Sequence, residues 1–332
     1  MNNTVLKAAQ LVCAILLIVS IFPMVNHGIG FADYTYSNAE KYTSGDAEIT
    51  KPVKNLDIDW TNGKVNITYH KGNSVDLSEK SNKPISKDLQ MRWYLDGDTL
   101  RIRFAKAGFR LNGNQQKELT VTLPEGTTFG DVDISATSGT LNIPDLQAEH
   151  LKLDVTSGNI FAAAKAKEIA CSATSGKLDL ILGNTENIKA YSTSGTIILD
   201  AEASEKTDIS STSGSIRIKM KQAGAVYADS TSGDIYAELG AVKKVKIEST
   251  SGDVQVKASS LEGLKIDTTS GSVKAWLPTD PGFIARLDTT SGRIDYDLSM
   301  AKQGDDYICG DGSGDVEISS TSGNISIIPS KE

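Results

Sequence analysis

The chain has 332 residues, of which 39% are hydrophobic, so it is long enough to bury a sizeable core. Its formal net charge of −8 argues against a nucleic acid as partner, because a phosphate backbone is bound by clustered Lys and Arg side chains.

The N-terminal segment contains no Asp, Glu, Lys or Arg from residue 8 to residue 32. As a helix, residues 8–32 would span roughly 37 Å, more than the ~30 Å of a bilayer core. Lys7 precedes this segment and Asp33 follows it, which predicts a cytoplasmic N-terminus and an extracytoplasmic remainder. We therefore predict that residues 1–32 form a single-pass signal anchor in the cell membrane. The alternative is a secreted chain, cleaved after Gly30-Phe31-Ala32.

The next part of the chain predicts a connector and then an end cap. Residues 33–55 are polar and are interpreted as the connector. Residues 56–67 alternate with a period of two, which predicts a strand, and they carry Thr-Asn-Gly as a diverged first repeat. Asp96-Gly97 between two alternating runs predicts a hairpin over residues 91–104. Because repeat arrays need atypical terminal units, we predict an irregular β N-terminal cap over residues 56–130.

From residue 137 onward the tripeptide Thr-Ser-Gly recurs ten times, at an interval close to 19 residues. The copies end at Gly139, Gly158, Gly176, Gly195, Gly214, Gly233, Gly252, Gly271, Gly292 and Gly323. A fixed period of this length indicates stacked repeats that bury their apolar faces against one another. We predict that the array covers residues 131–328 and that residues 329–332 are a tail.

Apolar residues flank each tripeptide with a period of two. In one unit, Val226 and Ala228 precede Gly233, and Ile235 and Ala237 follow it. Each unit is therefore two short strands joined at a Ser-Gly corner, and strands stacked in register would pair with their equivalents at ~4.8 Å. This predicts an all-β parallel β-solenoid, a single-stranded β-helix with coils of about 19 residues. The alternative is an antiparallel sandwich or barrel, although a two-residue hairpin would favour Asn-Gly or Asp-Gly.

The last units depart from the period. The segment 276–283 lengthens one loop by two residues, and about twelve extra residues precede Gly323. Pro329 is predicted to end the array, because proline stops strand addition at an open edge. Cys171 and Cys309 would lie about seven coils apart, too far for a disulfide, so both are predicted to be free thiols.

Acidic side chains recur four residues before the glycine in four consecutive units, facing outward. They are Asp229, Glu248, Asp267 and Asp288, with Lys246, Lys265 and Arg286 two positions before three of them. The pattern favours a salt-bridged surface, since alternating ladders of opposite charge offset the repulsion between stacked acids. A glycan or cation site on the four acids is the functional alternative, and paired carboxylates could also perform acid/base catalysis on sugars.

Other chemistries find no support in the sequence. The residue after each glycine varies, so a calcium ladder is not expected. The three histidines are His27, His70 and His150, and none stands in a zinc-type spacing with cysteine. No catalytic, cofactor-binding or metal-ligating residue is predicted, and the chain is expected not to be an enzyme.

Several motifs resemble a bacterial family described as β-strand-repeat "putative adhesins", also called the toastrack domain. They are the Thr-Ser-Gly-x-Ile repeat, Trp-Leu-Pro with Gly-Phe at 276–283, Gly-Asp-Gly at 310–312 and Thr-Ser-Gly-Asn-Ile-Ser-Ile at 321–327. The resemblance covers nearly all of residues 34–328. It implies an exported β-solenoid, often linked to envelope-stress systems, with no catalytic residues to assign.

Three functions follow as hypotheses. The first is a non-enzymatic, membrane-tethered surface protein that binds an envelope glycan or protein. The second is an envelope-stress accessory or scaffold acting through its membrane helix, and the third is a carbohydrate-active enzyme that uses the stacked carboxylates. Function is expected where the repeat fails: around Trp60 and Trp93, at residues 276–283, and in the insertion before Gly323.

Overall fold

The computed structural model describes residues 34–109 and 115–330, so the predicted membrane segment lies outside the described residues. Apart from one short 3-10 helix, η1 (Ala39–Lys41), the regular structure of these residues is β-strand. The strands are β1 (Thr43–Ser44), β2 (Ala47–Ile49), β3 (Asn55–His70), β4 (Val75–Ser81), β5 (Arg92–Asp96), β6 (Thr99–Arg103), β7 (Lys117–Pro124), β8 (Thr128–Ser175), β9 (Leu178–Ser194), β10 (Ile197–Ser211), β11 (Ile216–Ser230), β12 (Ile235–Ser249), β13 (Val254–Thr268), β14 (Val273–Leu277), β15 (Phe283–Thr289), β16 (Ile294–Tyr296), β17 (Ala301–Gln303), β18 (Asp306–Cys309), β19 (Gly314–Ser320) and β20 (Ile325–Pro329).

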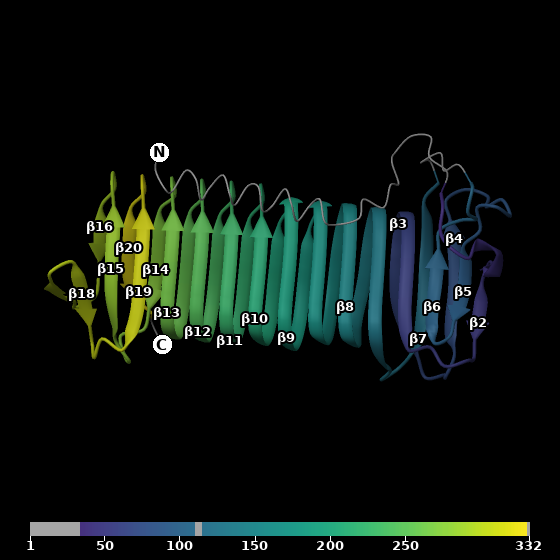
Figure 1. The fold of residues 1–332 in the computed structure, drawn as a ribbon, viewed down its shortest axis with the longest axis horizontal. Coiled ribbons are helices and arrows are strands. Elements are labelled where there is room, and N and C mark those ends of the chain that lie inside the picture. Colours follow the sequence, from purple (N-terminus) through teal and green to yellow (C-terminus); the bar gives the residue numbers. More distant parts are fainter. Residues whose placement is uncertain (1–33, 110–114, 331–332) are drawn as a thin grey trace.

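The central coils pair in parallel with their equivalents one repeat away. Ile197 of β10 lies opposite Leu178 of β9 and Ile216 of β11, and the same offset continues through β12 and β13. Figure 1 shows these coils side by side along the long axis of the molecule. The predicted all-β fold with parallel, in-register coils is therefore confirmed, and the alternative, an antiparallel sandwich or barrel, is excluded for this part of the chain.

The core follows from the alternation. In β11, Ile216, Ile218 and Met220 are buried in the first half of the strand, and Val226 and Ala228 are buried in the second half. Full burial of each Ile or Val side chain contributes roughly 1.5–3 kcal/mol. Because every coil repeats the pattern, the buried side chains form one continuous core along the stack.

The glycine of each Thr-Ser-Gly corner is required by the contact between neighbouring coils. A Cβ atom added to Gly214 would lie 1.9 Å from the carbonyl oxygen of Gly195, and one added to Gly158 would lie 1.7 Å from that of Gly139. Gly176 has a φ of +135°, whereas Gly195 and Gly214 lie outside the left-handed region. The steric requirement therefore holds whatever the local backbone conformation.

Near the C-terminus the spatial order of the coils departs from the chain order. β19 lies between β13 and β15, pairing in parallel with both, and β20 lies between β14 and β16. Figure 1 shows this last segment in yellow inside the stack. The prediction that Pro329 ends the array at an open edge is wrong, because Pro329 lies opposite Leu277 within the sheet. The insertion forms the outer hairpin β17–β18, which lets the chain return one coil inward.

Antiparallel strands close the N-terminal end. Gly63 of β3 lies opposite Gly139 of β8, and β6 and β7 pair with the other edge of β3. β5 and β6 form the predicted hairpin, with Leu95 opposite Leu100, so that prediction is confirmed. β4, β2 and β1 then add in antiparallel orientation. Cys171, in β8, and Cys309, in β18, are both free, as predicted.

A Gly214→Ala substitution is expected to lower the free energy of unfolding by about 1–3 kcal/mol, because the added methyl group overlaps the Gly195 carbonyl. Gly263→Ala is the matched control, since its Cβ atom would lie 3.9 Å from the nearest atoms. Denaturant unfolding of both variants measures the difference. Equal stability of the two variants would contradict the stacking constraint.

Candidate functional site

The predicted acids lie on the outer face formed by the second halves of β10 to β13 and by β19 and β15. The strand register places Asp229, Glu248 and Asp267 in three consecutive coils. Ser319 of β19 follows Asp267, and Asp288 comes only after it. The expectation of four consecutive acids is therefore wrong at its last member, because β19 inserts between the coils that carry Asp267 and Asp288.

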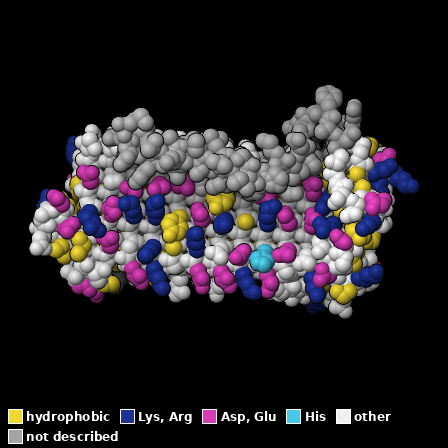
Figure 2. Space-filling view, in the orientation of Figure 1, with side chains coloured by type: hydrophobic (Ala, Val, Ile, Leu, Met, Phe, Trp, Pro, Cys, Tyr) yellow, Lys and Arg dark blue, Asp and Glu magenta, His cyan; other side chains and the backbone are white. Residues whose placement is uncertain are grey.

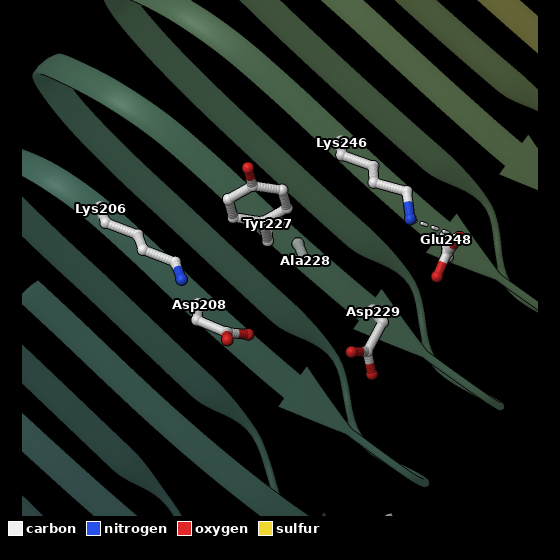
Figure 3. A pocket seen from close by; sticks show the side chains of 7 residues that line it. All are labelled: Lys206, Asp208, Tyr227, Ala228, Asp229, Lys246 and Glu248. Atoms are coloured by element: carbon white, nitrogen blue, oxygen red, sulfur yellow. Dashed lines mark ion pairs between the residues drawn. The ribbon is translucent and has the colours of Figure 1, made fainter. Parts of the chain in front are cut away.

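A shallow hollow of about 230 Å³ lies over β10, β11 and β12. It is lined by Lys206, Asp208, Tyr227, Ala228, Asp229, Lys246 and Glu248. Figure 3 shows the Tyr227 ring between Lys206 and Lys246, with the three carboxylates along one side. The Tyr227 side chain is 37% exposed, and the Lys206 Nζ atom lies 5.8 Å from its ring centroid.

The ion pairs on this face follow a two-residue pattern that fails at Asp229. Lys246 Nζ lies 2.9 Å from Glu248 Oε1, and Lys265 Nζ lies 3.9 Å from Asp267 Oδ2, each pair on a single strand. In the unit of Asp229 the equivalent position holds Tyr227 instead of lysine. Two outward acids of this face are thus salt-bridged, whereas Asp229 accepts a hydrogen bond from the Ser210 hydroxyl at 2.7 Å.

The surroundings of Asp229 favour its neutral form. Burial raises the pKa of its carboxyl to about 6, and the negative charges of Asp208 and Glu248 act in the same direction. The Ser210 hydrogen bond and the Lys246 charge oppose this change. Near neutral pH the hollow therefore combines an exposed aromatic ring, two lysines and a carboxyl group that can change its charge.

Asp288 lies in a second hollow, of about 790 Å³, at the C-terminal end of the stack. This hollow also combines a carboxylate with an aromatic ring and a cation, since Lys302 Nζ lies 5.1 Å from the Tyr307 ring centroid. Lys302 and Tyr307 come from the insertion before Gly323.

Comparison with protein families shows which family the described fold matches. The profile of the Toastrack DUF4097 family matches residues 53–259 and 229–328. The chain belongs to this family. None of the curated proteins compared matches the chain.

Solved structures similar to this toastrack chain include three bacterial proteins described as adhesion proteins. A "putative cell adhesion protein" from Clostridium sporogenes has 13% identity and a TM-score of 0.19, covering 86% of this chain and 100% of its own. A "putative adhesin" from Parabacteroides merdae has 14% identity and a TM-score of 0.45, covering 74% and 100%. A "putative adhesin" from Bacteroides fragilis has 13% identity and a TM-score of 0.31, covering 87% and 97%.

The toastrack coil explains which lining residues the sequence pattern missed. Lys206 lies in the outward column of Lys244, and Asp208 and Tyr227 lie in that of Lys246, one or two coils away. Aligning the outward positions of every unit would have shown them beside Asp229. The hollow also lies inside the regular array, whereas the expected aromatic site at Trp60 is fully buried.

Within residues 34–109 and 115–330, no group of three or more His, Cys, Asp or Glu side chains is arranged to hold a metal ion. In the same residues, no helix has the length and apolar character needed to cross a membrane. The predicted membrane helix at residues 8–32 stays a prediction.

Between pH 4 and pH 6 the toastrack fold is expected to lose stability as the pH rises. The pKa of Asp229 is about 6 in the folded protein and about 3.9 in an unfolded chain. The folded state therefore binds more protons in this window. Chemical denaturation as a function of pH should show a decline that Asp229→Asn reduces, with Asp200→Asn, on the first half of β10, as control. An identical decline in Asp229→Asn would contradict the assignment.

Proposed function

We propose that the chain is a non-enzymatic, membrane-tethered binding protein of the bacterial cell envelope. Its ligand is an envelope glycan that binds on the outer face of β10, β11 and β12. The observation that carries the proposal is the exposed Tyr227 ring in a hollow lined by carboxylates and amines.

The chemistry of the hollow suits a sugar chain. An aromatic ring offers an apolar face to the C–H groups of a sugar, and carboxylates and amines hydrogen-bond its hydroxyl groups. Ligand sites commonly combine a few well-placed polar groups with aromatic surface in this way. The same columns continue over neighbouring coils, so an extended glycan can follow the array beyond the hollow.

Binding is favoured over catalysis because two of the predicted acids already have partners. Glu248 is paired with Lys246, and Asp267 accepts a hydrogen bond from Ser319 Oγ at 2.6 Å.

One observation favours a carbohydrate-active enzyme: the pKa of Asp229 is raised and Glu248 lies beside it, and glycosidases combine a proton-donating acid with a second carboxylate. A hydrolysis screen with envelope glycans, repeated with Asp229→Asn, tests that alternative. Turnover that this variant abolishes would replace the binding proposal.

Tethering rests on the uncharged segment of residues 8–32, which is long enough to cross a bilayer. With Lys7 before it, the segment would leave the toastrack domain outside the cytoplasm. Envelope scaffolding through this helix is the other function compatible with a tether. Crosslinking followed by pull-down from native membranes separates the two, because a scaffold would capture a membrane protein also when Tyr227 is replaced.

Tyr227→Ala is expected to weaken glycan binding by roughly tenfold or more, corresponding to about 1.4 kcal/mol or more of lost stacking. Phe161→Ala is the matched control, because Phe161 is 40% exposed and has the Lys177 Nζ atom 5.8 Å from its ring centroid, but lies outside the hollow. Binding to purified envelope glycans can be measured by calorimetry. Equal losses in both variants would argue against the hollow as the site.

The full chain is expected to stay in the membrane fraction after alkaline carbonate extraction, and deletion of residues 8–32 should release it. N-terminal sequencing of the exported protein distinguishes an uncleaved anchor from a chain that starts at Asp33. Quantitative release of the full chain would refute the tether and leave the glycan-binding proposal to its own test.

A further inference from the structure

The N-terminal end of the core is closed by the segment 82–91, which connects β4 to β5 and is here called the end plug. Two backbone groups fix it to the cap: the Leu89 carbonyl accepts a hydrogen bond of 2.7 Å from Lys117 Nζ, and the Met91 N–H donates to Glu79 Oε2 at 3.0 Å. Leu89 and Met91 are buried. The end plug is therefore held in place from within.

The exposed side of this end carries unpaired cations. Lys80, at the end of β4, and Lys83 and Lys87, in the end plug, are exposed and make no ion pair within the described part of the chain. Figure 2 shows dark-blue side chains projecting from the right-hand end of the molecule, where β2 and β5 lie. Three acids also lie at this end. Glu118 of β7 lies opposite Lys80, Asp88 follows Lys87 and is paired with Lys106 at 3.2 Å, and Asp46 accepts a hydrogen bond from the Glu79 N–H at 2.9 Å.

Charge is distributed unevenly along the solenoid. Residues 34–130 contain 14 Lys and Arg against 12 Asp and Glu, a net charge of +2. Residues 131–332 contain 19 against 29, a net charge of −10. An anionic surface therefore repels the array, whereas it attracts the cap weakly.

The chain enters the fold at the cap as well. The Tyr34 N–H donates to the Phe109 carbonyl at 3.2 Å, and the Tyr34 carbonyl accepts from the Gly108 N–H at 2.7 Å. The Tyr34 hydroxyl accepts from the Phe104 N–H at 3.0 Å. Only Asp33 separates Tyr34 from the uncharged segment that ends at residue 32. A membrane helix in that segment would bring the cap to the bilayer surface.

We propose that Lys80, Lys83 and Lys87 bind the headgroups of anionic lipids, so that the solenoid stands on its N-terminal end with its acidic array directed away from the bilayer. The ten steps from Gly63 to Gly292 then carry the stack roughly 48 Å outward at ~4.8 Å per step. This inference rests on the proposed tether. It specifies the surface that meets the membrane and the lipid charge that this surface needs, because juxtamembrane lysines are attracted to anionic leaflets.

Hydrogen exchange of the full chain, reconstituted in vesicles, tests the contact. The two vesicle types are phosphatidylcholine alone and phosphatidylcholine with phosphatidylglycerol. Slower amide exchange at residues 80–92 is expected only in the anionic vesicles, and it should be lost at ~1 M salt, where charges are screened beyond about 3 Å. Lys80→Gln, Lys83→Gln and Lys87→Gln combined should remove this protection. The control variant, with Lys219→Gln, Lys243→Gln and Lys257→Gln in the array, should retain the protection.

Equal exchange at residues 80–92 in both vesicle types, or protection that survives the cap substitutions, would overturn the inference. A third sample contains phosphatidylcholine vesicles with soluble poly(glycerol phosphate). If residues 80–92 are protected in this sample but not in the phosphatidylglycerol vesicles, the ligand is an anionic polymer, and the inference is overturned. Carbonate extraction of the same samples reports the tether separately. A chain that is released by carbonate but protected by anionic vesicles refutes the anchor and retains the lipid-binding surface.

Discussion

The structure depends on the close approach of neighbouring coils at the Thr-Ser-Gly corner. The carbonyl oxygen of each glycine occupies the space where a Cβ atom of the next would lie, at 1.9 Å for Gly214 and 1.7 Å for Gly158. A coil displaced by one residue would put a side chain at this point and would also turn its apolar residues outward. The corner therefore fixes the register of each coil, and with it the alignment of every outward side chain into columns.

This constraint explains what the sequence could predict. The period of the glycine and the alternation around it determine the coil, the parallel pairing and the neighbouring positions of Asp229, Glu248 and Asp267. They do not determine the order of the coils, because any Thr-Ser-Gly unit can stack on any other. The unit ending at Gly323 lies between those ending at Gly271 and Gly292 because the hairpin β17–β18 turns the chain back. The sequence pattern therefore predicts Asp288 next to Asp267, whereas Ser319 lies between them.

The column of glycines ends at a lysine. Lys117 lies opposite Gly63, and its side chain is fully buried under Trp60 and Phe104, with Nζ 4.0 Å from the Phe104 ring centroid. Its ammonium donates to Glu79 Oε1 and to the carbonyls of Leu89 and Phe104, which satisfies all three N–H groups. Burial still lowers the pKa of Lys117 to about 8. Such a buried pair contributes little net stability, but removing one partner is costly. At this end of the stack, the buried Lys117–Glu79 pair therefore stands where the repeating coils carry a glycine.

The candidate site arises because the backbone pattern and the outward pattern are independent. Every coil needs its glycine and its inward residues, whereas an outward residue can change without disturbing the core. Lysine stands two residues before Glu248 and before Asp267 and forms an ion pair with each of them, but Tyr227 stands at that position before Asp229. The same column holds Asp208 one coil earlier, so the lysines stop at Lys246; Asp229 is left without a lysine in its own unit and has an aromatic ring beside it. The charge pattern changes at this site while the coil continues through it, so the hollow lies apart from the three irregular places where function is expected from the sequence.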